Sequence, residues 1–252
     1  MSRRIVCRLL PHALADGPRN MATDEVLLDA VAADPGSAVL RTYEWSTPTL
    51  SLGYFQAIAE AEADPRWGSV AVVRRPTGGG ALWHDREVTY AVILPANHPS
   101  ASRGVNLYAI VHETIAGVLR GRGVKLDRWG DRGAESPSTT KPFLCFADRT
   151  DEDLLSGPAK VVGSAQRRRA GAVLQHGSVL LRTSPTTPEL LGLGDLGAPE
   201  LDSGTLAAEL LGALAGALEL EARSSTLSDR EVTEADRLAR EVYERAGWTR
   251  KR

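Results

Sequence analysis

The sequence has few cysteines, no excess of charge of one sign and no long apolar run, and each of these absences excludes a class of protein. Only two of its 252 residues are cysteines, Cys7 and Cys145, too few for the disulfide framework of a small secreted protein. We therefore expect a cytoplasmic location. Neither sign of charge dominates, because 30 basic and 32 acidic residues give a formal net charge of -2. This balance argues against bulk nucleic-acid binding, which needs a basic field over many phosphates.

Long apolar runs are also missing. The longest, 206–220, is interrupted by Glu209 and Glu219 and falls short of a membrane span. The apolar run near the N-terminus is too short for a signal peptide, so we expect no membrane association. A glycine pattern at 192–197 matches a dinucleotide motif, but no convincing strand precedes it. The five histidines and two cysteines show no metal-ligand spacing, and we expect neither a metal nor a cofactor.

The apolar pattern predicts many short strands and scattered helices. Strands are expected at 5–9, 37–43, 49–53, 70–74 and 87–94, with a hairpin of 160–165 and 172–181; helices are expected at 20–33, 106–120, 206–218 and 229–246. Strands and helices do not alternate regularly, which favours a mixed α+β fold over a doubly wound sheet. We expect one domain over 1–252, with a loop at 129–142 and a C-terminal loop and helical extension over 186–252.

The strongest local signal is a run of three glycines, Gly78, Gly79 and Gly80. Without side chains, this loop permits unusual backbone angles and lets a ligand lie against the main chain. Its N–H groups suit a carbonyl or phosphate oxygen. Two arginines just upstream, Arg74 and Arg75, add positive charge for an anionic group. The alternative is a flexible surface turn.

Two further segments carry polar groups inside apolar strands. Lys160 leads the strand Lys160-Val161-Val162-Gly163-Ser164-Ala165-Gln166, where its ammonium can hold a carbonyl oxygen or favour a thiolate. The alternative is an edge-strand lysine that prevents aggregation. In the next strand, Gly177 indicates close backbone approach, while His176 alone is more typical of a packed core residue. Cys145 follows a polar loop, and by itself it is typical of a buried, inert thiol, as is Cys7.

Taken together, these segments resemble the biotin/lipoate A/B protein ligase family, and within it the LipM-type octanoyltransferases. The matching segments lie in the family's order at 20–25, 49–56, 74–84, 160–166, 175–178 and 244–248. The combination of RRPTGGG with KVVGSAQ is specific, whereas either motif alone is weaker. The resemblance implies a mixed sheet flanked by helices, related to class II synthetase and biotin-ligase catalytic domains, with the acyl chain in a tunnel.

The resemblance also implies a reaction. Cys145 is expected to take an octanoyl group from acyl carrier protein as a thioester and to pass it to a lysine of a lipoyl domain or of the glycine-cleavage H protein. Lys160 is expected to activate the thiol or position the carbonyl group. The other expected substrate-binding residues are Gly78, Gly79, Gly80, His84, Gly163, Ser164, His176 and Gly177. Arg74 or Arg75 is expected to meet the phosphopantetheine or the acidic carrier.

Two alternatives remain open. An ATP-dependent lipoate ligase would use Lys160 to hold an acyl-adenylate and would need ATP and Mg²⁺. A non-catalytic acyl-binding module would keep only the pocket. Cys145 favours the transferase, because the ligases need no cysteine at this position. The distance in space between Cys145 and Lys160 therefore decides how well the covalent mechanism fits.

Overall fold

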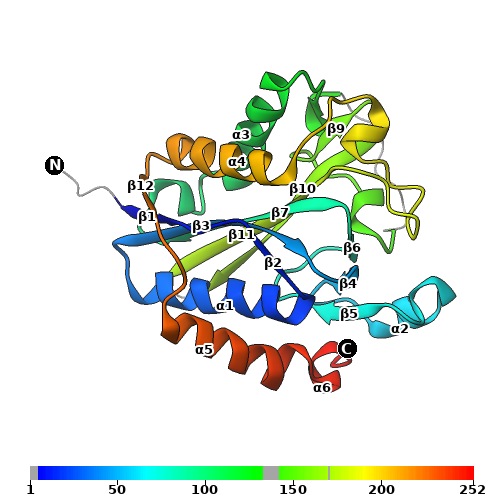
Figure 1. Cartoon of the computed structure of the whole chain (residues 1–252), viewed down its shortest axis with the longest axis horizontal. Helices are drawn as coiled ribbons and strands as arrows, with labels where there is room; N and C mark the ends of the chain where they lie inside the picture. The colour runs from blue at the N-terminus through cyan, green and yellow to red at the C-terminus, as the bar shows by residue number, and fades with distance from the viewer. Residues whose placement is uncertain (1–4, 133–141, 170) are drawn as a thin grey trace.

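A large mixed sheet forms the centre of the molecule (Figure 1). The computed structural model describes residues 5–132, 142–169 and 171–252, and within them nine strands form this sheet. The strand order is β12-β1-β3-β7-β11-β10-β9-β8, with β2 beside β3. The strands are β1 (Val6–Leu9), β2 (Ala13–Ala15), β3 (Ser37–Trp45), β7 (Glu87–Pro95), β8 (Asp127–Arg128), β9 (Leu154–Ser156), β10 (Ala159–Arg169), β11 (Ala172–Leu180) and β12 (Glu221–Ser224). Pairing is parallel from β12 to β3 and antiparallel from β3 to β8.

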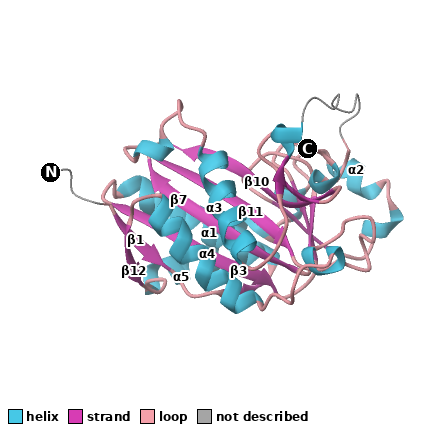
Figure 2. Ribbon diagram, turned by 90° about the horizontal axis from the view of Figure 1, so that it is seen from above, coloured by secondary structure: helices cyan, strands magenta, loops and turns pink. Residues whose placement is uncertain are grey.

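Helices cover both faces of this sheet (Figure 1), and seen from above they lie across its strands (Figure 2). On one face lie α1 (Gly17–Ala33) and α5 (Asp229–Leu238), and on the other lie α3 (Leu107–Gly121) and α4 (Ser203–Ala217). Each pair buries its apolar stripe in its own cluster against the sheet. The α+β class with flanking helices is therefore confirmed. No helix in the described ranges has the length and apolar character to cross a membrane.

A smaller sheet stands beside the large one and carries the triple-glycine loop. Its strands are β4 (Thr49–Leu52), β5 (Ala71–Arg74) and β6 (Leu82–His84), in the order β5-β4-β6. The short helix α2 (Ile58–Glu62) and a 3₁₀ turn at Pro65–Trp67 lie between β4 and β5. An apolar cluster that includes Trp67, Trp83 and Leu144 packs under this sheet. The loop is thus anchored at both ends by buried strands.

Several elements differ from the sequence prediction, and three of them have a clear physical reason. Helix α1 starts at Gly17 because Asp16 caps it, accepting a 2.9 Å hydrogen bond from the amide of Arg19, with a proline in the first turn. The helix predicted at 229–246 ends at Leu238, continues as a π-helical turn over Ala239–Tyr243, and is followed by the separate short helix α6 (Ala246–Thr249). Strand β12 was not predicted, because it is polar and mostly exposed and is defined by its parallel pairing with β1.

The predicted hairpin of β10 and β11 is confirmed. β10 is longer than predicted at both ends, and β11 ends one residue earlier than predicted. Within the expected C-terminal extension, 186–252, α4 and α5 pack on opposite faces of the large sheet and β12 joins its edge. The loop expected at 129–142 begins with a 3₁₀ turn over Trp129–Arg132. The part of that loop at 133–141 lies outside the described residues.

Candidate active site

Cys145 lies directly beside the triple-glycine loop that joins β5 to β6. It begins a 3₁₀ turn, and its amide donates a hydrogen bond of 2.8 Å to the carbonyl oxygen of Ala81. The amide of Ala81 in turn donates to the carbonyl oxygen of Phe143, at 2.9 Å. A Cβ atom on Gly80 would lie 3.1 Å from the Cys145 amide nitrogen, so glycine permits this close contact. Two segments that are far apart in the sequence therefore meet at one place.

The ammonium group of Lys160 lies next to the thiol of Cys145. Lys160 Nζ is 3.9 Å from Cys145 Sγ and donates to the carbonyl oxygen of Cys145 at 3.1 Å. A second carbonyl oxygen, that of Asp148, lies 3.4 Å from the same nitrogen. Lys160 is 4% exposed, whereas Cys145 is half-buried. The two groups on which the sequence interpretation depends are thus close enough for the ammonium to stabilise a thiolate.

Lys160 has an acidic partner, Asp153, that the sequence interpretation missed. Asp153 Oδ2 lies 2.7 Å from Lys160 Nζ, and both side chains are at most 3% exposed. The same carboxylate accepts a 2.7 Å hydrogen bond from the amide of Thr150. The pair forms because β9 and β10 make a hairpin around Gly157, whose φ of 56° favours glycine. Its signal in the sequence is the Gly157-Pro158 turn between two apolar runs.

Gly163 makes space for the lysine rather than lining a cavity. A Cβ atom at this position would lie 2.6 Å from Lys160 Cε, closer than two carbon atoms approach without a shift. Gly177, opposite Ser164 on β11, is equally confined, because a Cβ atom there would lie 2.3 Å from the carbonyl oxygen of Gly163. Both glycines therefore act on the site through the position of Lys160 and its strand.

A cavity of about 760 Å³ opens at this point. Its size is typical of a small-molecule site. The residues of its wall that the sequence singled out are Gly78, Gly79, Gly80, Cys145, Lys160 and Ser164. Its wall also includes polar residues that the sequence did not mark, among them Tyr108, His112, Asp153 and Gln166. Among the residues described, no three His, Cys, Asp or Glu side chains are grouped so that they could hold a metal ion.

Arg74 and Arg75 are buried, and each guanidinium group is bonded to the backbone. Arg74 is 0% exposed and donates to four carbonyl oxygens, including that of Thr249 at 2.7 Å. Arg75 donates to the carbonyl oxygens of Gly78 and Gly80, at 2.7 and 2.6 Å. Neither arginine is on the wall of the Cys145 cavity, so the structure gives no support to the expectation that one of them meets the phosphopantetheine or the acidic carrier. Burial lowers the pKa of Arg75 to about 10, which leaves it cationic at neutral pH.

His84, His176 and Gly177 lie behind the loop rather than on the wall of the Cys145 cavity. They border a second space of about 20 Å³, together with apolar side chains that include Trp45 and Leu82. The two ring nitrogens of His84 lie 2.7 Å from Ser51 Oγ and 2.7 Å from a Glu87 oxygen. Burial lowers the pKa of His84, against the opposing effect of Glu87. The expectation that His84 lines the same pocket as the glycines therefore does not describe this conformation.

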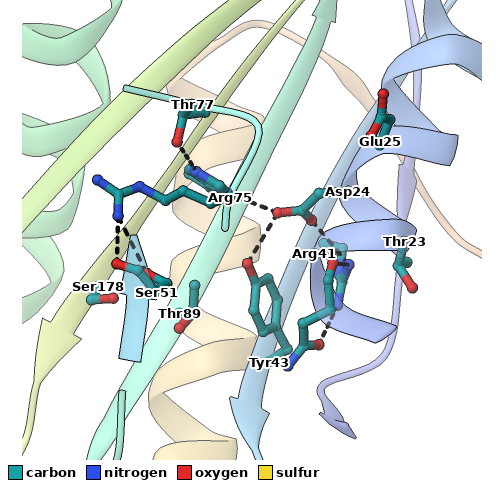
Figure 3. A network of polar contacts seen from close by, with 12 residues as sticks. Thr23, Asp24, Glu25, Arg41, Tyr43, Ser51, Arg75, Thr77, Thr89 and Ser178 are labelled. Carbon is teal, nitrogen blue, oxygen red and sulfur yellow. Dashed lines mark hydrogen bonds and ion pairs between the residues drawn. The ribbon is translucent and has the colours of Figure 1, made fainter. Parts of the chain in front are cut away.

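His176 belongs to a buried network centred on Asp24, whose members Asp24, Arg41, Tyr43 and Thr77 are labelled in Figure 3. One oxygen of Asp24 accepts from Arg41 at 2.9 Å, and the other lies 3.0 Å from the hydroxyl of Tyr43 and 2.9 Å from His176 Nδ1. His176 Nε2 lies 2.7 Å from the hydroxyl of Thr77, just before the glycines. Burial and the charge of Asp24 raise the pKa of Tyr43, so this hydroxyl remains a donor. The network fixes the base of the loop without facing the cavity.

The two thiols differ sharply in their surroundings. Cys7 is 0% exposed within the apolar cluster under α3 and α4, and burial raises its pKa to about 12. Its thiol is therefore buried and protonated, as expected from the sequence. Cys145 is half-buried, borders the cavity and lies beside an ammonium group. The apolar residues around Cys145 in the sequence are typical of a buried, inert thiol. In the structure, however, this thiol lies at the cavity beside Lys160.

Comparisons with known proteins show the family to which the sequence is similar. Residues 16–190 match the model of the lipoyl protein ligase A/B catalytic domain. The octanoyltransferase LipM of Moorella thermoacetica is 39% identical over 179 residues, 69% of this chain and 64% of the relative. LipM of Bacillus subtilis is 38% identical over 184 residues, 69% of this chain and 65% of the relative. The chain thus matches slightly less than two thirds of the length of these relatives.

Solved structures resemble the whole described fold at lower sequence identity. A Thermoplasma acidophilum protein described as a lipoate protein ligase, solved with lipoic acid, has a TM-score of 0.77 and 20% identity over 98% of this chain and 100% of its own. Lipoate-protein ligase A with bound ATP has a TM-score of 0.74 and 22% identity over 97% of this chain and 98% of its own. At these identities the likeness establishes the fold.

Proposed function

The chain belongs to the lipoyl protein ligase A/B catalytic domain family, and we propose that it is an octanoyltransferase working through a thioester on Cys145. The observation that carries this proposal is the 3.9 Å distance from Cys145 Sγ to Lys160 Nζ on the wall of one cavity. Neither an ATP-dependent ligase nor a simple binding module needs a thiol at this point. A cytoplasmic location fits the proposal, because both cysteines are unpaired.

The first half-reaction transfers the acyl group from octanoyl-acyl carrier protein to Cys145. The thiolate attacks the thioester carbonyl carbon, the new C–S bond forms, and the carrier's thiol leaves. Lys160 stabilises the attacking thiolate and the oxyanion that follows, as a preorganised cation beside the thiol. The buried carboxylate of Asp153 holds that cation in place. One thioester replaces another of similar energy, so the step needs no ATP, Mg²⁺ or other cofactor.

The triple-glycine loop is proposed to position the acyl chain. Gly78, Gly79 and Gly80 give the cavity a wall without side chains, next to the thiol. Ala165 borders both this cavity and the small space beside His84 and His176. The end of the acyl chain is proposed to extend toward that space. Its present volume, about 20 Å³, is too small for an eight-carbon chain, so Leu82 and its neighbours must move when the chain enters.

The second half-reaction passes the acyl group to a lysine of a lipoyl domain or of the glycine-cleavage H protein. The lysine nitrogen attacks the thioester carbon, the amide bond forms, and the Cys145 thiolate leaves. Covalent catalysis thus divides the transfer into two easier steps. Lys160 lies where it stabilises the departing thiolate as well as the attacking one.

The test is incubation with octanoyl-acyl carrier protein in the absence of ATP, followed by intact-mass measurement. We expect one added octanoyl group on the natural chain and on Cys7→Ser, and none on Cys145→Ser. A parallel reaction with free lipoate and ATP tests the ligase alternative. An adduct that persists in Cys145→Ser, or a product that forms only with ATP, contradicts the proposal.

A further inference from the structure

A serine hydroxyl on the cavity wall is bonded to a buried histidine. Ser164 Oγ, on β10, lies 2.7 Å from Nε2 of His112 on α3. His112 is 1% exposed, and its Nδ1 lies 2.5 Å from the carbonyl oxygen of Glu152. Both Ser164 and His112 border the cavity that contains Cys145. The arrangement is a serine–histidine pair in which a backbone carbonyl orients the ring.

The hydrogen-bond partners determine which atom donates and which accepts in each of these contacts. A carbonyl oxygen only accepts, so the proton of the neutral ring is on Nδ1 of His112, and Nε2 has a free lone pair. Ser164 therefore donates its hydroxyl proton to His112 Nε2. On its other side the Ser164 oxygen accepts from Gln175 Nε2 at 3.1 Å, and the Gln175 oxygen accepts from Gln166 Nε2 at 2.7 Å. All donors thus point toward His112.

The ring is neutral at physiological pH. Burial lowers the pKa of His112, and it outweighs the hydrogen bond to Glu152 and the nearby charge of Asp153. The ammonium of Lys160 acts in the same direction as burial, and the side chain of Glu152 acts against it. On its own helix the ring contacts the edge of Tyr108, at 6.4 Å between ring centroids. His112 is therefore a proton acceptor at the pH where the enzyme works.

The second half-reaction needs such an acceptor. A lysine that forms an amide must lose protons from its nitrogen, and the amine lone pair is required for attack. Lys160 is unsuited to accept them, because its ammonium is paired with Asp153 at 2.7 Å and donates to carbonyl oxygens. Within the described part of the cavity wall, the free Nε2 lone pair of His112 reaches the cavity through Ser164.

We propose that Ser164 and His112 remove the proton from the acceptor lysine during the second half-reaction. The acceptor lysine reacts as its neutral amine, after its ammonium form has released one proton to solvent. The amine nitrogen forms the C–N bond to the acyl carbon while its second proton passes to Ser164 Oγ, whose own proton passes to His112 Nε2. The C–S bond breaks, and its electron pair stays on the Cys145 thiolate. His112 then returns a proton to solvent or to that thiolate. This inference rests on the proposed octanoyl transfer and concerns its second step alone.

The experiment compares two nucleophiles on isolated octanoyl-enzyme. Both nucleophiles lose a proton from nitrogen as the C–N bond forms. The lipoyl-domain lysine is a strongly basic amine whose nitrogen holds this proton firmly, whereas hydroxylamine is weakly basic and gives the proton up to water readily. The variants are His112→Gln, whose oxygen still accepts from Ser164 but holds no proton, and Ser164→Ala. Relative to transfer to hydroxylamine, transfer to the lipoyl domain is expected to fall by about 10²-fold in both. His98→Gln is the matched control, because His98 is also buried but bonded to the carbonyl of Leu218, away from this cavity.

The pH profile separates proton transfer from a structural role. In the natural chain, lipoyl-domain transfer is expected to decline at acid pH as His112 becomes protonated, and His112→Gln is expected to lose that decline. An unchanged ratio between the nucleophiles, or equal losses with both, overturns the inference. If the natural chain forms no octanoyl-enzyme, the proposed function fails instead, so the two failures are distinguishable.

Discussion

Two desolvated polar clusters lie on opposite sides of the triple-glycine loop, and they differ in what is left unpaired. Around Asp24, both carboxylate oxygens are occupied by Arg41, Tyr43 and His176, and all of these groups are buried. Around Lys160, the carboxylate of Asp153 fixes the ammonium, but the neighbouring thiol borders an open cavity. The polar groups around Asp24 bond to one another, whereas the cluster around Lys160 leaves the Cys145 thiol accessible to a substrate in the cavity.

This difference implies that the Asp24 cluster stabilises the fold and that the Lys160 cluster takes part in the reaction. Buried ionic groups with complete partners mainly resist disruption, since removing one partner leaves another charge unpaired. A thiol that lies beside an ammonium group on the wall of a cavity is instead a candidate for catalysis. Both clusters contain residues that the sequence marked as site residues, and only the position of the cavity distinguishes their roles. Variants in the two clusters should therefore affect different measurements.

The largest expected effect is on acyl transfer in Lys160→Met. Loss of the ammonium should slow acylation of Cys145 by about 10²- to 10³-fold, the usual cost of removing one group that stabilises an oxyanion. Stopped-flow mixing with octanoyl-acyl carrier protein, followed by mass measurement, gives the rate. The double variant Lys160→Met with Asp153→Asn avoids an unpaired buried carboxylate and should be equally slow. The matched control is Lys125→Met, which changes an exposed lysine. If this variant slowed acylation as much as Lys160→Met does, the role assigned to Lys160 would be wrong.

The next effect is on stability in Asp24→Asn. Asparagine keeps the shape but leaves the buried guanidinium of Arg41 without its counter-charge, so the free energy of unfolding should fall by about 3–5 kcal/mol. Urea denaturation measures the change. Asp29→Asn, on the same helix, breaks an exposed pair with Arg169 and should cost less than about 1 kcal/mol. Equal stability of Asp24→Asn and Asp29→Asn would contradict the contrast between the two clusters. So would folded Asp24→Asn protein that loses as much acylation as Lys160→Met.

The smallest effect is a difference in thiol labelling. At mildly alkaline pH, iodoacetamide should modify Cys145 in the folded protein and leave Cys7 intact, because burial raises the pKa of Cys7 to about 12 and excludes the reagent. Peptide mass mapping locates the label. Addition of urea should make both thiols reactive. Labelling of Cys7 before Cys145 in the folded chain would show that the comparison of the two thiols is wrong.

Much of the fold was predictable because it depends on local patterns. Helix α3 follows apolar spacing after its Asn106 cap, and the β10–β11 hairpin follows two apolar runs around a glycine turn. Strand β12 has no such pattern, since its place is set by pairing with β1, more than two hundred residues earlier. Sequence periodicity carries no information about such distant partners.

The candidate site likewise contains residues that the sequence predicted and residues that it did not. The three glycines and Lys160 stood out as local signals, whereas Cys145 gained its role only through the family resemblance; the structure brings them together. The burial of Arg74 and Arg75 was not visible, because arginine next to a glycine loop usually indicates exposure to an anion. His112 was also missed, since a histidine in an amphipathic helix gives no sign of a serine partner that lies 52 positions along the chain. Contacts between distant segments decide which polar residues face the cavity.

The central claim is that acyl transfer passes through Cys145. Its most direct test isolates octanoyl-enzyme made with isotopically labelled octanoyl-acyl carrier protein, removes the donor, and adds a lipoyl domain without ATP. The account predicts that the label leaves Cys145 and appears on the lipoyl-domain lysine at least as fast as steady-state turnover. Label that stays on Cys145, or that moves more slowly than turnover, would contradict it.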